Sequence, residues 1–346
     1  MIKPRSFDWW MTLCAGWMLT GLYLDGWAHR HIPNLETFFT PWHGLLYSGF
    51  FVTFGLLGVT AWRNHARGWP WLESVPPGYG LSLIGMLIFL VGGVCDLIWH
   101  TLFGIEADIE ALLSPTHLIL AIGGTLIGAG PFRARWGRVD SDDGPPGLIN
   151  YLPMILSLTF GWSVLTFFTQ YAHPFIHPWA SGPIPQEPFN PERMGLSALL
   201  IQSALMSGLV LLIIRRWRRW PLPFGSLAVM LIVNAALMGI LETDFRFLAV
   251  GVPAGLIADE MNRRLKPSMS ALRFRLFAFS IPAIYFSWYF VVLASTDGLW
   301  WPIDLWAGAI VMTGIVGWLI SYLVLPPDRP SGAIPPWPLD SSRQQD

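Results

Sequence analysis

Long apolar stretches, separated by short polar segments, recur along most of the chain. Their lengths are close to the ~20 residues that an α-helix needs to cross a bilayer. A membrane-spanning strand would alternate polar and apolar residues, and these stretches do not, so the pattern predicts helices. The stretches cover residues 9–28, 42–62, 79–100, 116–131, 149–172, 194–214, 221–241, 247–261, 276–295 and 303–325. We therefore expect an all-α, polytopic integral membrane protein with about ten transmembrane helices.

Most basic residues fall on one side of the membrane if successive predicted helices run in opposite directions. Only Arg30, Arg193 and Arg246 fall on the other side. Because Lys and Arg favour cytoplasmic loops, we expect the N and C termini to be cytoplasmic and the opposite loops to be periplasmic or extracellular. This arrangement suits a bacterial-type inner (plasma) membrane. The cytoplasmic set comprises Lys3, Arg5, Arg63, Arg67, Arg133, Arg135, Arg138, the RRWRR run at 215–219, Arg263, Arg264, Lys266, Arg273 and Arg275.

The composition agrees with a membrane protein. Of the 346 residues, 53% are hydrophobic and only 12% are charged, which a soluble globular domain rarely shows. Residues 326–346 are rich in Pro and polar residues, and we predict a disordered cytoplasmic tail there. No motif for binding phosphate or nucleic acid occurs in the sequence.

Histidines gather at one predicted surface of the membrane. Of the eight histidines, only His65 falls on the cytoplasmic side. Snorkelling explains Lys and Arg at interfaces much better than it explains His, so the skew indicates a shared ligand. The seven outer histidines are His29, His31, His43, His100, His117, His173 and His177.

Two passages in the first third of the chain repeat one pattern. Each has Asp-x3-His at the outer end of a helix, then an acidic loop, then Pro-x-His at the start of the next helix. The first contains Asp25 and His29 with FTPWH at 39–43, and the second contains Asp96 and His100 with LSPTH at 113–117. Internal repeats of this kind indicate repeated structural units. We therefore divide the chain into residues 1–131, a four-helix region of two repeated hairpins, and residues 149–325, six further helices.

The spacing in each hairpin suits a metal ion. Residues four apart share one face of a helix, so each Asp-x3-His offers a carboxylate and an imidazole together. A carboxylate inside the apolar boundary is costly unless it is paired or bound to metal, and this donor set suits Cu, Zn or Fe. A single Asp–His pair could instead be purely structural, but two matching copies favour metal. The predicted ligands are Asp25, His29, His43, Asp96, His100 and His117.

Further polar residues on the outer side are second-tier candidates. They could orient the ligands, relay protons or bind metal, although solvated loops and turns would also contain such residues. These candidates are Glu36, Glu106, Glu110, His173, His177, Glu242 and Asp244.

Residues ~10–130 resemble the C subunit of the copper membrane monooxygenases, the particulate methane and ammonia monooxygenase family. The resemblance rests on Asp-x3-His, the T-P-x-H element ending at His43, and the second hairpin with WHTLF and SPTH. It implies one copper site at Asp25, His29 and His43, and a neighbouring site at His43, Asp96 and His100. His117 matches a nearby family histidine. Asp96 stands where the family has Asn, which adds a negative charge.

The resemblance implies a membrane oxidoreductase of monooxygenase type. One or two copper ions would activate O2 for the oxidation of a small apolar substrate that arrives from the bilayer, with zinc or iron as alternative metals. Partner subunits and a periplasmic electron or copper donor would accompany it. Two other functions stay open: a periplasm-facing copper-binding or delivery protein without catalysis, and a zinc-dependent membrane hydrolase. Because ligation needs neutral His, metal occupancy should fall below about pH 6.

Overall fold

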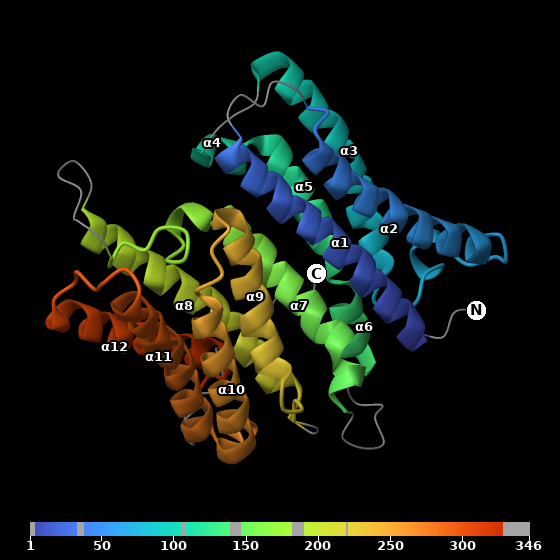
Figure 1. Ribbon diagram of the computed structural model, residues 1–346. Coiled ribbons are helices and arrows are strands. Elements are labelled where there is room, and N and C mark those ends of the chain that lie inside the picture. Colours follow the sequence, from blue (N-terminus) through green and yellow to red (C-terminus); the bar gives the residue numbers. More distant parts are fainter. Residues whose placement is uncertain are drawn as a thin grey trace, which may run out of the picture.

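The computed structural model describes residues 4–32, 38–104, 108–138, 147–181, 190–218 and 221–327. Every regular element in these ranges is helical (Figure 1). Short 3-10 turns lie at Trp71–Glu73, Gln170–Ala172 and Pro267–Met269. The α-helices are α1 (Pro4–His31), α2 (Pro41–His65), α3 (Gly80–Phe103), α4 (Asp108–Leu113), α5 (Pro115–Gly128), α6 (Gly130–Arg138), α7 (Leu148–Phe168), α8 (Pro191–Arg216), α9 (Ser226–Glu242), α10 (Leu248–Leu265), α11 (Ala271–Ser295) and α12 (Ile303–Val324).

Seven helical segments are long and apolar enough to cross a membrane: α2, α3, the run α5–α6, α7, α8, α11 and α12. The prediction of an all-helical, multi-pass membrane protein is therefore confirmed for the described ranges. Helix α1 has 28 residues and α9 has 17, and α10 carries four charged residues near its end. Crossings by these three helices, and the side on which each terminus lies, stay predictions.

Several predicted helix boundaries differ from the observed ones by a few residues, and two of the differences have a clear local cause. The stretch 149–172 is helical only to Phe168, because a 3-10 turn and Pro174 follow. The stretch 221–241 becomes helical only at Ser226. Pro221 and Pro223 precede that helix, and Gly225 has a φ of 95°, which a side chain would disfavour.

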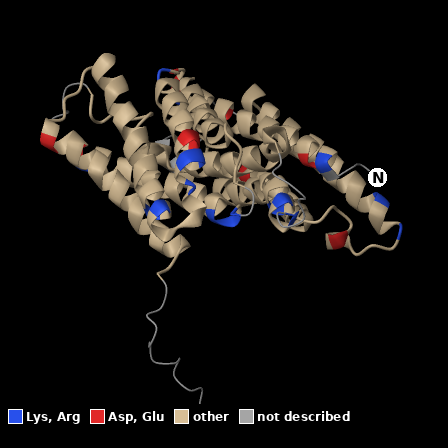
Figure 2. Ribbon diagram, turned by 90° about the horizontal axis from the view of Figure 1, so that it is seen from below, with Lys and Arg blue, Asp and Glu red and all other residues tan. Residues whose placement is uncertain are grey.

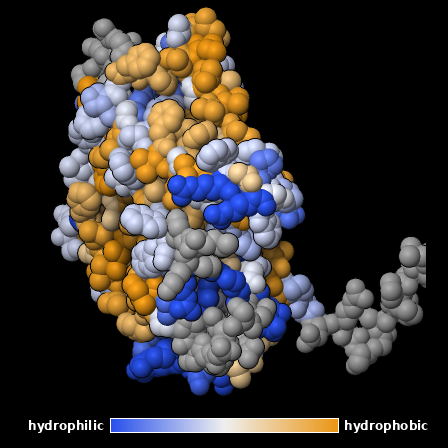
Figure 3. Space-filling view, turned by 90° about the vertical axis from the view of Figure 1, so that its right-hand side faces the viewer, coloured by the Kyte–Doolittle hydropathy of each residue, from blue (hydrophilic) through white to orange (hydrophobic). Residues whose placement is uncertain are grey.

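Apolar side chains face outward in stripes along the spanning helices. On α3, Leu87, Val91, Val94 and Ile98 are all more than half exposed and lie on one helix face. Charged residues are sparse along the helices, and hydrophobic residues cover broad areas of the surface (Figures 2 and 3). A soluble protein rarely exposes such stripes, so lipid contact explains them.

The helices form two groups that meet along α1 (Figure 1). Helices α1, α2, α3 and α5 enclose a smaller core that includes Phe50, Tyr79 and Phe89. Helices α7 to α12 enclose a larger core that also includes Tyr23 of α1. Leu22 packs against both cores. Helix α1 therefore joins the predicted four-helix region to the remaining helices.

Within the smaller group, α1 pairs with α2 and α3 pairs with α5. Glycines permit close contact: a Cβ atom on Gly21 would lie 2.6 Å from Leu46 Cα, and one on Gly123 would lie 2.7 Å from Phe89 N. At the opposite ends, Tyr79 donates a hydrogen bond of 2.7 Å to Asp8, which also pairs with Arg138. These contacts fix the two hairpins that carry the repeated motif.

Candidate metal centre

The second helix of each hairpin starts with the same local structure. Thr40 caps α2 and accepts a hydrogen bond of 3.1 Å from the His43 backbone N–H, with Pro41 at the first helical position. Ser114 caps α5 and accepts one of 3.4 Å from the His117 N–H, with Pro115 in the same place. Capping by Thr or Ser and a Pro at the first helical position are both favourable at helix starts. The repeated sequence therefore places a histidine in the first turn of both helices.

The first hairpin brings three predicted ligands together. Oδ2 of Asp25 lies 3.3 Å from Nε2 of His43 and 3.7 Å from Nε2 of His29. Ligand atoms of the three residues all lie within 4.8 Å of one another. Asp25 and His43 are buried, and the Oδ1 atom of Asp25 has no hydrogen-bond partner. A buried carboxylate is costly unless it is hydrogen-bonded, paired with a positive charge or bound to a metal ion.

The second hairpin repeats this geometry. Oδ1 of Asp96 lies 3.2 Å from Nε2 of His117 and 3.6 Å from Nε2 of His100. These ligand atoms also lie within 4.8 Å of one another. Thr116 donates a hydrogen bond of 2.8 Å to the same Asp96 oxygen. We call the two sets the Asp25 group (Asp25, His29, His43) and the Asp96 group (Asp96, His100, His117).

Backbone carbonyls fix the orientation of one imidazole in each group. His43 Nδ1 lies 2.7 Å from the Phe38 carbonyl oxygen, and His100 Nδ1 lies 3.1 Å from that of Gly104. A carbonyl only accepts hydrogen bonds, so each Nδ1 must carry the proton. In the neutral ring Nε2 is then a lone pair, and it faces a carboxylate oxygen. Two such acceptors repel each other unless a proton or a metal ion lies between them, and the ring orientation is one typical of metal-bound histidine.

The two groups are neighbours. The ring centroids of His43 and His100 are 6.3 Å apart, and Phe38 stacks on His43 at 4.9 Å. The resemblance implied that His43 joins Asp96 and His100 in a second site, but the structure places His117 with that pair. The cause is the hairpin itself, because each Pro-x-His helix start returns to the Asp-x3-His of its own hairpin. All six predicted ligands are thus brought together, in two sets of three.

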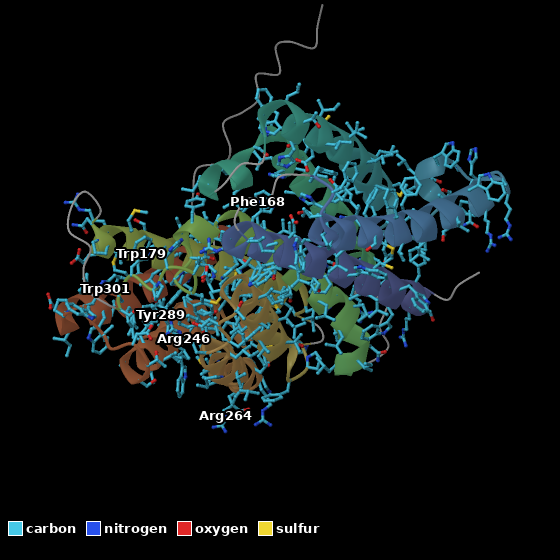
Figure 4. The ribbon with its side chains drawn as sticks, turned by 45° about the horizontal axis from the view of Figure 1, so that its top comes forward. Phe168, Trp179, Arg246, Arg264, Tyr289 and Trp301 are labelled. Atoms are coloured by element: carbon cyan, nitrogen blue, oxygen red, sulfur yellow. The ribbon has the colours of Figure 1, made fainter. Side chains whose placement is uncertain are left out.

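Among the second-tier candidates, His177 and Glu242 line the cavity beside the two groups. Glu242 forms an ion pair with Arg30, one residue beyond His29. Asp244 pairs with Arg246 instead, which in turn pairs with Asp297. Arg246 is labelled in Figure 4, well away from Phe168 at the rim of the cavity. Asp244 is not among the cavity-lining residues.

His173 is buried outside the cavity, in the connection between α7 and α8. Its Nδ1 accepts a hydrogen bond of 3.2 Å from the Phe175 N–H. Burial, with repulsion from His177, lowers the pKa of His173 to about 3. This histidine is therefore neutral and structural. Glu36 and Glu106 lie outside the described residues, as does the side chain of Glu110, whose backbone belongs to α4.

A cavity of about 610 Å³ adjoins both groups. Asp25, His43, Asp96 and His117 line one end, and the rest of its lining is mostly apolar residues of α1, α5 and α7. Tyr47 also lines it, and its hydroxyl is buried without a hydrogen-bond partner. Tyr47 and Thr116 were not among the residues predicted from the sequence. A Thr two residues after the capping Ser was the available signal for Thr116, but the first hairpin has Trp42 in that position.

No protein-family model, curated protein or solved structure matches this chain. The Asp25 and Asp96 groups and their cavity are therefore the features that point to a function.

Proposed function

We propose that this protein is a membrane-embedded copper oxidoreductase of monooxygenase type that oxidises an apolar substrate. The observation that supports it most directly is the pair of three-residue groups, in which imidazole Nε2 atoms converge on a buried carboxylate. Imidazole with carboxylate suits Cu, and the resemblance of residues ~10–130 to copper monooxygenase subunits favours copper over zinc or iron. Bound copper would supply the redox chemistry with O2.

The residues of the chain have separate tasks in this proposal. Asp25 and Asp96 supply negative charge, while the carbonyls of Phe38 and Gly104 hold the His43 and His100 rings in place. The burial of Asp96 and His100 limits the access of water. The apolar walls of the adjoining cavity would admit a substrate that dissolves in lipid and exclude polar competitors.

The proposal includes the membrane topology. All ten long helices, including α1, α9 and α10, would cross the bilayer, both termini would be cytoplasmic, and the metal groups would face the periplasm or cell exterior. The distribution of Lys and Arg supports this. In a variant without Cys14 and Cys95, Cys placed at Thr101 or Phe245 should react with an impermeant thiol reagent in intact cells. Cys at Arg264 should react only after permeabilisation, and the reverse pattern would contradict the topology.

The metal can be tested directly. Protein purified without added metal should contain copper, and Asp25→Ala and Asp96→Ala should each lower the copper content. Electron paramagnetic resonance of the Cu(II) form should show nitrogen ligation. Zinc in place of copper would instead favour a hydrolase, and wild-type metal content in both variants would exclude these groups as the metal centre.

Catalysis needs a separate test, because copper binding alone is also expected of a copper-delivery protein. Copper-loaded protein in lipid nanodiscs should consume O2 when an artificial reductant and an apolar substrate are supplied. Asp25→Ala or Asp96→Ala should abolish the part of the O2 consumption that depends on the substrate. If the copper-loaded wild type consumes no O2 with any reductant, the oxidoreductase proposal is contradicted. A copper-binding or delivery role would then be favoured.

A further inference from the structure

The cavity beside the metal groups is much longer than a small gaseous substrate needs. Its volume of about 610 Å³ is in the range of pockets that enclose drug-sized ligands. Along α1 its lining extends from His29 to Ala15, and along α5 from His117 to Gly128. At ~1.5 Å per helical residue, the α5 side alone corresponds to a depth of roughly 16 Å.

Away from the metal groups, the cavity is lined by apolar and small residues. Leu19, Leu120 and Phe160 line it, together with the small residues Gly124 and Gly161. A Cβ atom added to Gly161 would meet no atom within 4 Å. The glycines therefore leave open an apolar space along α5 and α7, at the boundary between the two helix groups.

The end of the cavity at the metal groups is polar. His31, Tyr171 and the ion pair of Arg30 with Glu242 lie there, beside Asp25 and His117. Phe168 and Trp179, labelled in Figure 4, also belong to this outer end. A ligand that matches the whole cavity has a long apolar body and one end at the polar, metal-binding rim.

We infer that the cavity binds a free unbranched hydrocarbon chain of roughly 12 carbons, an alkane or a primary alcohol, as the substrate class of this protein. An extended chain advances ~1.2 Å per bond, so such a chain has the length of the cavity. The chain end at the rim lies beside the Asp25 and Asp96 groups. This inference rests on the proposed function for the oxidation step but not for binding.

The oxidation step balances with an external reductant. One oxygen atom of O2 enters a C–H bond of the chain end and gives an alcohol, and the other oxygen atom leaves as water. The reductant, a hydroquinone, is oxidised to the quinone and supplies two electrons and two protons. For an alkane the product is a primary or near-terminal alcohol.

Binding is tested with dodecan-1-ol that carries a photoreactive diazirine near its methyl end. In nanodiscs, irradiation should label peptides that contain Ala15, Gly128 or Gly161, and excess n-dodecane should compete. Gly161→Leu places a side chain roughly 10 Å below Phe168 and should lower this labelling at least tenfold. Gly208→Leu is the matched control, because a Cβ atom there also meets nothing within 4 Å and Gly208 does not line the cavity.

Labelling elsewhere, or labelling that Gly161→Leu leaves unchanged, would overturn the inference. Lipid extraction distinguishes the two sources of a hydrocarbon chain. A tightly bound phospholipid that n-dodecane does not displace would show an acyl chain of the bilayer in the cavity and would also overturn it.

The same labelling is repeated on protein stripped of metal by a chelator. Persistent, Gly161-dependent labelling together with an absence of O2 consumption would retain the chain-binding cavity and reject the proposed oxidoreductase. Oxidation of n-butane with no labelling by the long-chain probe would retain the proposed oxidoreductase and reject the chain-binding cavity. The two proposals therefore fail separately.

Discussion

Nε2 of His43 lies 3.3 Å from Oδ2 of Asp25, although the Nδ1 atom of the same ring must hold its proton for the Phe38 carbonyl. In its neutral form the imidazole therefore turns a lone pair toward a carboxylate. His100 does the same toward Asp96 at 3.6 Å. One unfavourable arrangement could be an accident of packing. Its repetition in two hairpins makes both groups candidate metal sites.

Asp25→Asn tests whether the carboxylate charge holds the ion. Asn has nearly the same shape as Asp but lacks the negative charge, so metal should leave the Asp25 group while the fold persists. If each group binds one ion, copper per protein should fall by about half. Asp96→Asn should give the same loss, and the double variant should bind none. The measurement is elemental analysis beside circular dichroism, and a double variant with full copper content would refute the charge argument.

His43→Ala and His117→Ala distinguish two separate groups from a shared histidine. Because His43 groups with Asp25 and His29, and His117 groups with Asp96 and His100, each variant should lose the ion of its own group. The nitrogen hyperfine signal that remains should differ between the variants, since it comes from the other group. Loss of both ions in His43→Ala, with full retention in His117→Ala, would restore the shared arrangement.

The sequence predicted which side chains lie together because local geometry determines their positions. Asp25 with His29, and Asp96 with His100, share a helix face by spacing alone, and Pro41 and Pro115 mark the helix starts that carry the other histidines. The grouping depends on which helices pair, and the family resemblance suggested a different one. Short-range pattern determines an element, whereas tertiary packing determines its partners.

Other features could not be read from the chain because they depend on contacts distant in sequence. The separation of Asp244 from the cavity follows from its ion pair with Arg246, and the inclusion of Glu242 follows from its pair with Arg30. The burial of His173 depends on Phe175 and the surrounding helices. The cavity itself arises where α1, α5 and α7 meet, and no single stretch of sequence encodes it.

Thr116→Val should weaken the Asp96 group without emptying it. The Thr116 hydroxyl donates to Asp96 Oδ1, the atom nearest His117, and Val keeps the shape but removes the donor. Loss of an orienting hydrogen bond costs roughly 10–100-fold in metal affinity. Competition with a copper chelator measures the change. Thr159→Val is the control, because that buried hydroxyl donates to the Ile155 carbonyl within α7. Equal copper affinities in the wild type and both variants would show that Thr116 does not support the Asp96 group.

His173 should make stability fall as the pH is lowered. Its pKa is about 3 in the folded protein, against ~6.5 in an unfolded chain, so between these values the unfolded state takes up a proton that the folded state does not. This loss of folding stability is absent above pH 6.5 and grows as the pH falls, by up to about 1.4 kcal/mol per pH unit. His173→Asn keeps an acceptor for the Phe175 N–H but does not titrate. Metal-free wild type and variant, unfolded in detergent at pH 7.5 and pH 5, should therefore differ in slope, with the variant losing less stability. Parallel curves would show that His173 is protonated in the folded protein at pH 5.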